Sequence, residues 1–73
     1  MVVKLLNIAQ ETVITCDQAF LNYKEGSLSL NFSDDQTARD NEVLIKQSGG
    51  KTIHSDNTII VTNLSDFDFV FEK

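Results

Sequence analysis

The stretch Ser27–Ser33, SLSLNFS, decides the fold class, because apolar and polar side chains alternate along it without a break. Leu28, Leu30 and Phe32 fall on one face of an extended chain, and only small polar side chains fall on the other. A period of two residues is typical of a strand with one buried and one solvated face. The sequence therefore predicts a half-buried β-strand at this position.

A second strand is predicted directly before it. Ala19, Leu21 and Tyr23 also alternate with polar positions, and Lys24-Glu25-Gly26 separates the two runs with turn-forming residues. Two alternating runs joined by a short turn that contains glycine are typical of a hairpin. Residues 19–33 are therefore predicted to form a β-hairpin.

A second hairpin is predicted downstream. Glu42–Gln47 is rich in apolar residues, Ser48-Gly49-Gly50 has turn composition, and Lys51–His54 is expected to return as a strand. The polar segment Ser33–Asn41 before it is interpreted as a loop with at most one helical turn, because Ser33 and Gln36 have the spacing of a capping box.

The C-terminal third continues the strand pattern. Ser55-Asp56-Asn57 is a predicted turn into a strand at Thr58–Thr62, and the chain closes on residues 65–73, SDFDFVFEK. In that closing strand we expect Phe67, Phe69 and Phe71 to share a buried face. The opposite, solvated face is expected to hold Asp66, Asp68 and Glu72, interrupted by Val70.

These segments favour one all-β domain over residues 1–73, a small sandwich or barrel of about six short antiparallel strands joined by hairpins. Valine, isoleucine and threonine occur six times each, alanine three times and proline never, which is a strand-forming composition. The alternative is an α+β fold with an N-terminal helix at residues 5–24 over an antiparallel sheet. Leu5, Ile8, Ala9, Thr12 and Cys16 have helical spacing, but the branched run Thr12-Val13-Ile14-Thr15 argues against it.

The charge distribution limits the classes of partner. The net charge is −5, and the second half, residues 34–73, carries eight acidic against four basic side chains. Nucleic-acid binders and proteins that adhere to anionic membranes usually show a basic patch, so we expect neither direct nucleic-acid binding nor membrane binding. A lone cysteine and an opening run without a signal-peptide pattern are expected of a cytoplasmic protein.

Three partial motifs do not reach the pattern that their chemistry requires. Gly50-Lys51-Thr52 resembles the end of a P-loop, but Ile45 stands where the first glycine is needed. The acidic run from Asp34 to Glu42 lacks the ligand spacing of a calcium loop. Cys16 and His54 are the one pair that offers a nucleophile and a base, and no sequence signal brings them together. We therefore expect no enzyme, and no catalytic, cofactor or metal site.

The expected function is a non-catalytic protein–protein interaction module that self-associates as a homodimer or larger closed oligomer. Three runs are apolar on both faces, Val2–Leu6, Val43–Ile45 and Ile59–Val61, and a two-sided strand must be covered twice. Ile59, Ile60 and Val61 are the expected contacts between copies. The alternative is a small acidic inhibitor that mimics nucleic-acid phosphates and binds a basic partner protein, for which Asp66, Asp68 and Glu72 are the candidate residues.

Overall fold

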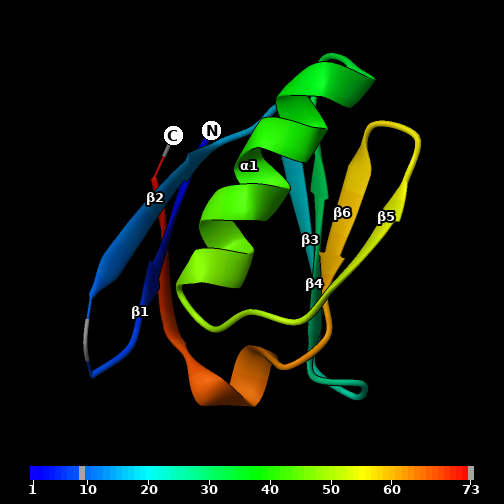
Figure 1. Cartoon of the computed structure of the whole chain (residues 1–73). Helices are drawn as coiled ribbons and strands as arrows, with labels where there is room; N and C mark the ends of the chain where they lie inside the picture. The colour runs from blue at the N-terminus through cyan, green and yellow to red at the C-terminus, as the bar shows by residue number, and fades with distance from the viewer. Residues whose placement is uncertain (9, 73) are drawn as a thin grey trace.

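Two antiparallel sheets and one long helix make up the computed structural model, which describes residues 1–8 and 10–72 (Figure 1). The three-stranded sheet has the order β2-β1-β7, with β1 at Val2–Leu6, β2 at Glu11–Thr15 and β7 at Asp68–Glu72. The four-stranded sheet has the order β3-β4-β6-β5, with β3 at Gln18–Asn22, β4 at Ser27–Asn31, β6 at Thr58–Val61 and β5 at Thr52–Ser55. The helix α1 covers Asp35–Gln47, and a short 3-10 helix, η1, covers Leu64–Asp66.

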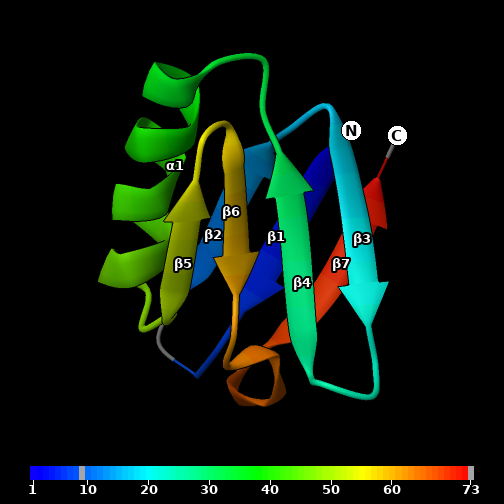
Figure 2. The same ribbon diagram turned by 90° about the vertical axis from the view of Figure 1, so that its right-hand side faces the viewer.

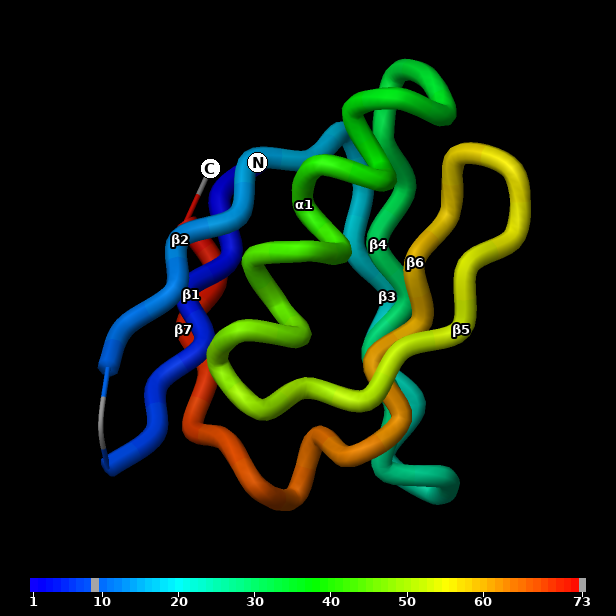
Figure 3. Tube along the Cα trace, in the orientation of Figure 1, coloured from blue at the N-terminus to red at the C-terminus, as the bar shows by residue number. Residues whose placement is uncertain are grey.

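The two sheets face each other, and α1 lies along one side of this sandwich (Figure 2). The helix packs against β5 and β6 of one sheet and against β2 of the other, so it closes the side where β2 and β5 form the edges. The strands of the two sheets cross diagonally (Figure 2). The first and last strands are paired, with Val2 opposite Glu72, which places the two ends of the chain side by side (Figure 3).

The core lies between the two sheets and follows from the alternation of the strands. Val3, Leu5 and Ile14 of the three-stranded sheet are fully buried, as are the inward-facing residues of the other sheet, Leu28, Leu30, Ile59 and Val61. Phe32, just after β4, and Ala38 and Ile45 from α1 belong to the same cluster. Because burying one such side chain contributes about 1.5–3 kcal/mol, these alternating positions supply the main driving force for the fold.

The predicted hairpin at residues 19–33 is confirmed. Strands β3 and β4 pair with Ala19 opposite Leu30 and Leu21 opposite Leu28, so the apolar residues of both strands share the inner face. The turn ends at Gly26, whose φ of +67° lies in the left-handed region that glycine adopts without steric cost. The predicted turn at Ser55-Asp56-Asn57 is also confirmed, since it joins β5 to β6.

The predicted loop at Ser33–Asn41 and the predicted strand at Glu42–Gln47 are both wrong, because most of this segment is α1. Asp34 caps the helix, and its carboxylate accepts a hydrogen bond of 2.7 Å from the Thr37 N–H. Within the helix, Asp35 pairs with Arg39 and Glu42 with Lys46, both at the i, i+4 spacing that stabilises helices. Local capping and charge pairing therefore favour helix over the extended chain.

Ser48-Gly49-Gly50 ends this helix and does not turn a hairpin. The Gly50 N–H donates to the Ile45 carbonyl at 2.9 Å and the Gly49 N–H donates to the Lys46 carbonyl at 3.1 Å, which is the Schellman pattern. Gly49 has a φ of +97°, so it takes the left-handed position that this motif requires.

The fold class is therefore mostly β with a helix, in agreement with the α+β alternative and not with an all-β fold, and it is not a closed barrel. The N-terminal helix of that alternative is wrong, however. Its predicted range, residues 5–24, contains the last two residues of β1 and all of β2 and β3, and Ala9 within it lies outside the described residues. None of the described residues belongs to a helix with the length and hydropathy of a membrane span.

The closing strand buries its phenylalanines unequally. Phe67 is buried and Phe69 is partly buried against the core, whereas Phe71 remains 41% exposed near the end of β7. Val70 and Glu72 lie on the outer face, where the Glu72 carboxylate is 3.2 Å from the Lys4 ammonium. Asp66 belongs to η1 and not to the strand, and Lys73 of the predicted closing strand lies outside the described residues.

Candidate interaction surface

The outer face of the four-stranded sheet is left uncovered by the fold, since only the inner face packs on the core. Pairing between the strands places the outward residues in rows across the sheet. One row joins Phe20, Ser29, Ile60 and Ile53, and a second row joins Gln18, Asn31, Thr58 and Ser55. Asn22 and Ser27 form a third, shorter row. We call this surface the neutral face, because none of these residues is ionisable.

The apolar row of the neutral face exposes large side chains to solvent. Phe20 on β3 and Ile53 on β5 are each 55% exposed, and Ile60 between them is partly exposed. Ser29 lies between Phe20 and the neighbouring pair Ile60 and Ile53, so three of the four positions of the row are apolar. Exposed apolar side chains rimmed by polar residues are typical of surfaces that contact another molecule. The row spans the whole width of the sheet, from one edge strand to the other.

The second row is tied together by side-chain hydrogen bonds. The Asn31 amide donates to the Gln18 side chain at 3.4 Å, and the Thr58 hydroxyl donates to the Asn31 side-chain oxygen at 2.9 Å. These bonds hold the polar groups in place beside the apolar row. An ordered surface loses less side-chain entropy when it binds.

The three residues that we predicted from the sequence as contacts between copies do not point to the same face of the sheet. Ile59 and Val61 are fully buried and point toward the other sheet, so they are core residues. Only Ile60 lies on the outer face. Phe20 and Ile53 were not predicted as contact residues from the sequence. A signal for them is present, since each is an apolar residue at a position of its alternating strand where a polar residue is expected.

The acidic residues proposed as partner contacts do not form one array. Asp68 and Glu72 lie at the two ends of β7, and Glu72 is paired with Lys4. Asp66 accepts a hydrogen bond of 3.0 Å from the Asn63 amide within the η1 turn. At least two of the three carboxylates therefore have contacts inside the chain.

His54 connects the β5–β6 hairpin to α1. Its Nε2 is 2.6 Å from the Asp56 carbonyl oxygen and 3.1 Å from Asp35 Oδ1, and its Nδ1 is 3.9 Å from Glu42 Oε1. Because both neighbours of Nε2 are acceptors, this nitrogen carries the hydrogen. The Thr52 hydroxyl also donates to Glu42, at 2.7 Å. The cluster anchors the helix, and the described residues contain no group of three or more His, Cys, Asp or Glu that could hold a metal ion.

Cys16 lies in the connection between β2 and β3 and is 5% exposed. Burial raises the pKa of its thiol, partly offset by the charge of the N-terminus, and Asp17 raises it further. A raised pKa disfavours the thiolate, which is the nucleophilic form. The His54 ring contacts Asp35 and Asp56 and not the Cys16 thiol.

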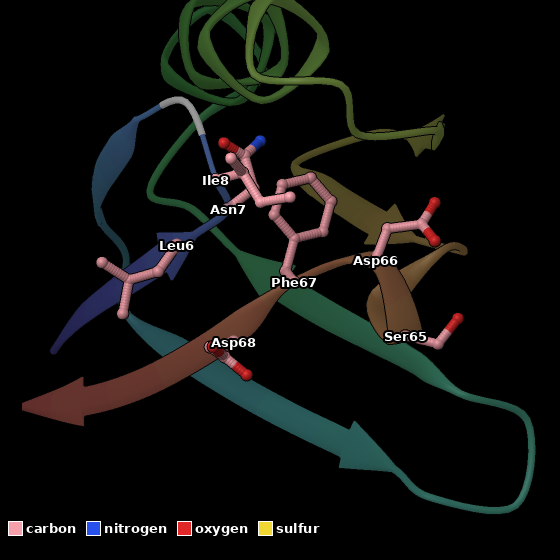
Figure 4. Close-up of a pocket in the computed structure, with 7 residues that line it drawn as sticks. All are labelled: Leu6, Asn7, Ile8, Ser65, Asp66, Phe67 and Asp68. Carbon is pink, nitrogen blue, oxygen red and sulfur yellow. The ribbon is translucent and has the colours of Figure 1, made fainter.

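An open depression of about 310 Å³ lies next to η1 (Figure 4). The Phe67 ring points toward Ile8 and Asn7, whereas the side chains of Asp66 and Ser65 point away from the ring (Figure 4). Asn7 is occupied in donating a hydrogen bond of 2.6 Å to the Ser48 carbonyl. The Asp66 and Ser65 side chains therefore do not converge beside the Phe67 ring, as the polar groups of a ligand site usually do.

Comparison of the chain with protein-family models, with curated proteins and with solved structures found no match. The functional argument therefore rests on the surface of this molecule alone.

Proposed function

We propose that this protein is a non-catalytic protein–protein interaction module that binds a second copy of itself. The observation that carries the proposal is the neutral face, with its apolar row of Phe20, Ile60 and Ile53 in a chain of net charge −5. A basic partner would gain no electrostatic attraction from a surface without carboxylates. A second copy brings the same uncharged surface, so the shared negative charge of the two chains is kept away from the contact.

The non-catalytic part of the proposal is supported by the state of the candidate nucleophile. The Cys16 thiol is buried with a raised pKa, and the His54 ring serves as a link between α1 and the β5–β6 hairpin. A nucleophile needs an adjacent base and access for its substrate.

The acidic-inhibitor alternative receives less support from the arrangement of the carboxylates. Asp35, Glu42 and Glu72 are each within 4 Å of a basic side chain of the same chain. Phosphate mimicry requires carboxylates that are free to face a basic surface. We therefore favour self-association.

Sedimentation equilibrium at micromolar concentration tests the proposal. We expect a mass above the 8.2 kDa of one chain. A double variant, Phe20→Thr with Ile60→Thr, removes two of the three apolar side chains of the apolar row and should weaken self-association by roughly tenfold or more, because truncating a hot-spot residue of an interface costs about 2 kcal/mol or more. Threonine keeps the strand propensity of these positions.

The matched control is Val13→Thr with Val70→Thr, which makes the same kind of change on the outer face of the three-stranded sheet, where both valines are exposed. This control should keep the mass of the parent protein. A parent protein that stays monomeric up to high micromolar concentration, or equal losses in the two double variants, would show the proposal to be wrong.

A further inference from the structure

The four edge strands of this fold differ in how they are protected against pairing with another chain. An edge strand offers unpaired N–H and C=O groups, and natural proteins usually guard such edges with charged side chains or a covering element. The edge strand β2 contains Glu11, β5 contains His54, and β7 contains Asp68 and Glu72. Strand β3, with the sequence QAFLN, is the one described edge strand without an ionisable side chain.

The same edge borders the side of the sandwich that the helix does not cover. Helix α1 closes the β2/β5 side, while β3 and β7 form the edges on the opposite side (Figure 2). Ala19, Leu21 and Phe69 are only partly buried there, and Phe71 is 41% exposed. The rings of Phe69 and Phe71 are in contact, with centroids 5.5 Å apart. Apolar side chains at this side thus remain available to a further layer of protein.

We infer that two copies of this chain join through their β3 strands, antiparallel and across a two-fold axis, so that the two four-stranded sheets become one continuous sheet. This inference rests on the proposed self-association and states where it occurs. A symmetric contact suits β3 because a two-fold axis pairs a strand with itself in antiparallel orientation. Main-chain hydrogen bonds would then satisfy the free edge of both copies at once.

The pairing has a single register that uses the whole strand. Residues directly opposite each other in a sheet point to the same face, so an outward residue must meet an outward residue. With the axis at Phe20, all five residues of β3 are paired, and a shift by two positions leaves residues at each end unpaired. In this register Phe20 meets Phe20 of the second copy, Gln18 meets Asn22, and Ala19 meets Leu21. The apolar row then continues from Ile53 of one copy to Ile53 of the other.

Chemical cross-linking tests the position of the seam. In the Phe20→Cys variant, two cysteines face each other with Cβ atoms about 4.5–5.5 Å apart. A short bis-maleimide should then link the two copies roughly tenfold or more faster than in the Ile53→Cys variant, because the reaction at the seam is intramolecular within the dimer. Ile53 is as exposed as Phe20 and lies on the same face, but at the far edge. Native Cys16 is buried and is the same in both variants.

A pair of charge variants tests the register without changing Phe20. Gln18→Lys with Asn22→Lys places like charges opposite each other twice in the dimer and should weaken it, whereas Gln18→Lys with Asn22→Glu places opposite charges there and should preserve it. Both positions are exposed, so the fold is expected to tolerate either change. The double-lysine variant has a net charge of −3 (−5 + 2), whereas the lysine–glutamate variant keeps −5 (−5 + 1 − 1). The weaker overall repulsion would by itself favour association of the double-lysine variant, so the predicted order runs against the general electrostatic effect.

The outcomes separate the seam from the proposed function. Faster cross-linking at position 20 together with a weakened double-lysine dimer supports the seam. If the parent protein dimerises, but the cysteine variants at positions 20 and 53 cross-link equally or the two charge variants weaken the dimer equally, the β3 seam is wrong and self-association still stands. Face-to-face stacking of the neutral faces would give this result. A monomeric parent protein overturns both.

Discussion

At the scale of single residues, Asp34 fixes the start of α1. Its carboxylate accepts the Thr37 N–H, one of the donors that a helix leaves unpaired in its first turn. The backbone hydrogen bond from Thr37 is the largest cause that lowers the pKa of Asp34, and the Thr37 side chain adds to it. A residue in a polar segment, without an apolar neighbour in the sequence, thus decides where the helix begins.

We predict that Asp34→Ala lowers the urea midpoint at pH 7, while Asp34→Asn keeps most of it, because asparagine caps helices about as well as aspartate. The lowered pKa in the folded state means that the charged cap stabilises the fold above the ordinary pKa of aspartate. This contribution is lost as the pH falls through the folded pKa. The difference between parent and Asp34→Ala should therefore shrink in acid. Equal losses for the two variants at pH 7 would contradict the capping role.

At the scale of elements, the sequence predicts the hairpin of β3 and β4 well and α1 poorly, for a physical reason. The hairpin alternates cleanly and is held by a turn with Gly26. The inward stripe of α1 contains Ala38, Ile45 and the polar residues Asn41 and Glu42, whereas apolar Val43 is 53% exposed. Only two apolar residues, Ala38 and Ile45, mark the buried face of the helix, so the Asp34 cap and the i, i+4 charge pairs supply much of the local information.

The matched variants Ile45→Ala and Val43→Ala test this placement. In a strand the two side chains would share a face and both would matter, whereas on the helix only Ile45 is buried. We expect Ile45→Ala to cost about 2–5 kcal/mol, a large part of the roughly 4–11 kcal/mol expected for a domain of this length. Val43→Ala should change stability by less than about 0.5 kcal/mol. Similar denaturation midpoints for the two variants would contradict the helix.

The candidate surface, too, could be predicted only in part from the alternation of side chains in the sequence. Alternation correctly implies that Ile60 and its neighbours Ile59 and Val61 point to opposite faces, but it does not say which face is covered. That depends on the second sheet, which buries Ile59 and Val61 and leaves Ile60 outside. Long-range packing is not encoded in local spacing, so the surface became evident only once the two sheets were in place.

At the scale of the whole molecule, ionisable side chains are distributed away from the neutral face. Many of them lie on α1, in turns such as Lys24-Glu25 and Asp56, and on the outer face of the three-stranded sheet, while Lys51 directly precedes β5 and His54 of β5 contacts Asp35 of α1. Each copy nevertheless carries a net charge of −5, so two copies repel each other at long range. Self-association through a neutral surface is then opposed by the charge of the molecule as a whole and not by any residue in the contact.

This arrangement predicts the response to salt. Raising the ionic strength from about 0.01 M to 0.15 M shortens the screening length from roughly 30 Å to 8 Å, which weakens the repulsion between two acidic copies. Apolar and main-chain contacts at the seam contain no ion pair to be screened, so the dimer should tighten with salt. A complex held by carboxylates on a basic partner would loosen instead. Sedimentation equilibrium across this range of sodium chloride measures the change, and dissociation of the self-associated protein as salt rises would contradict a neutral interface.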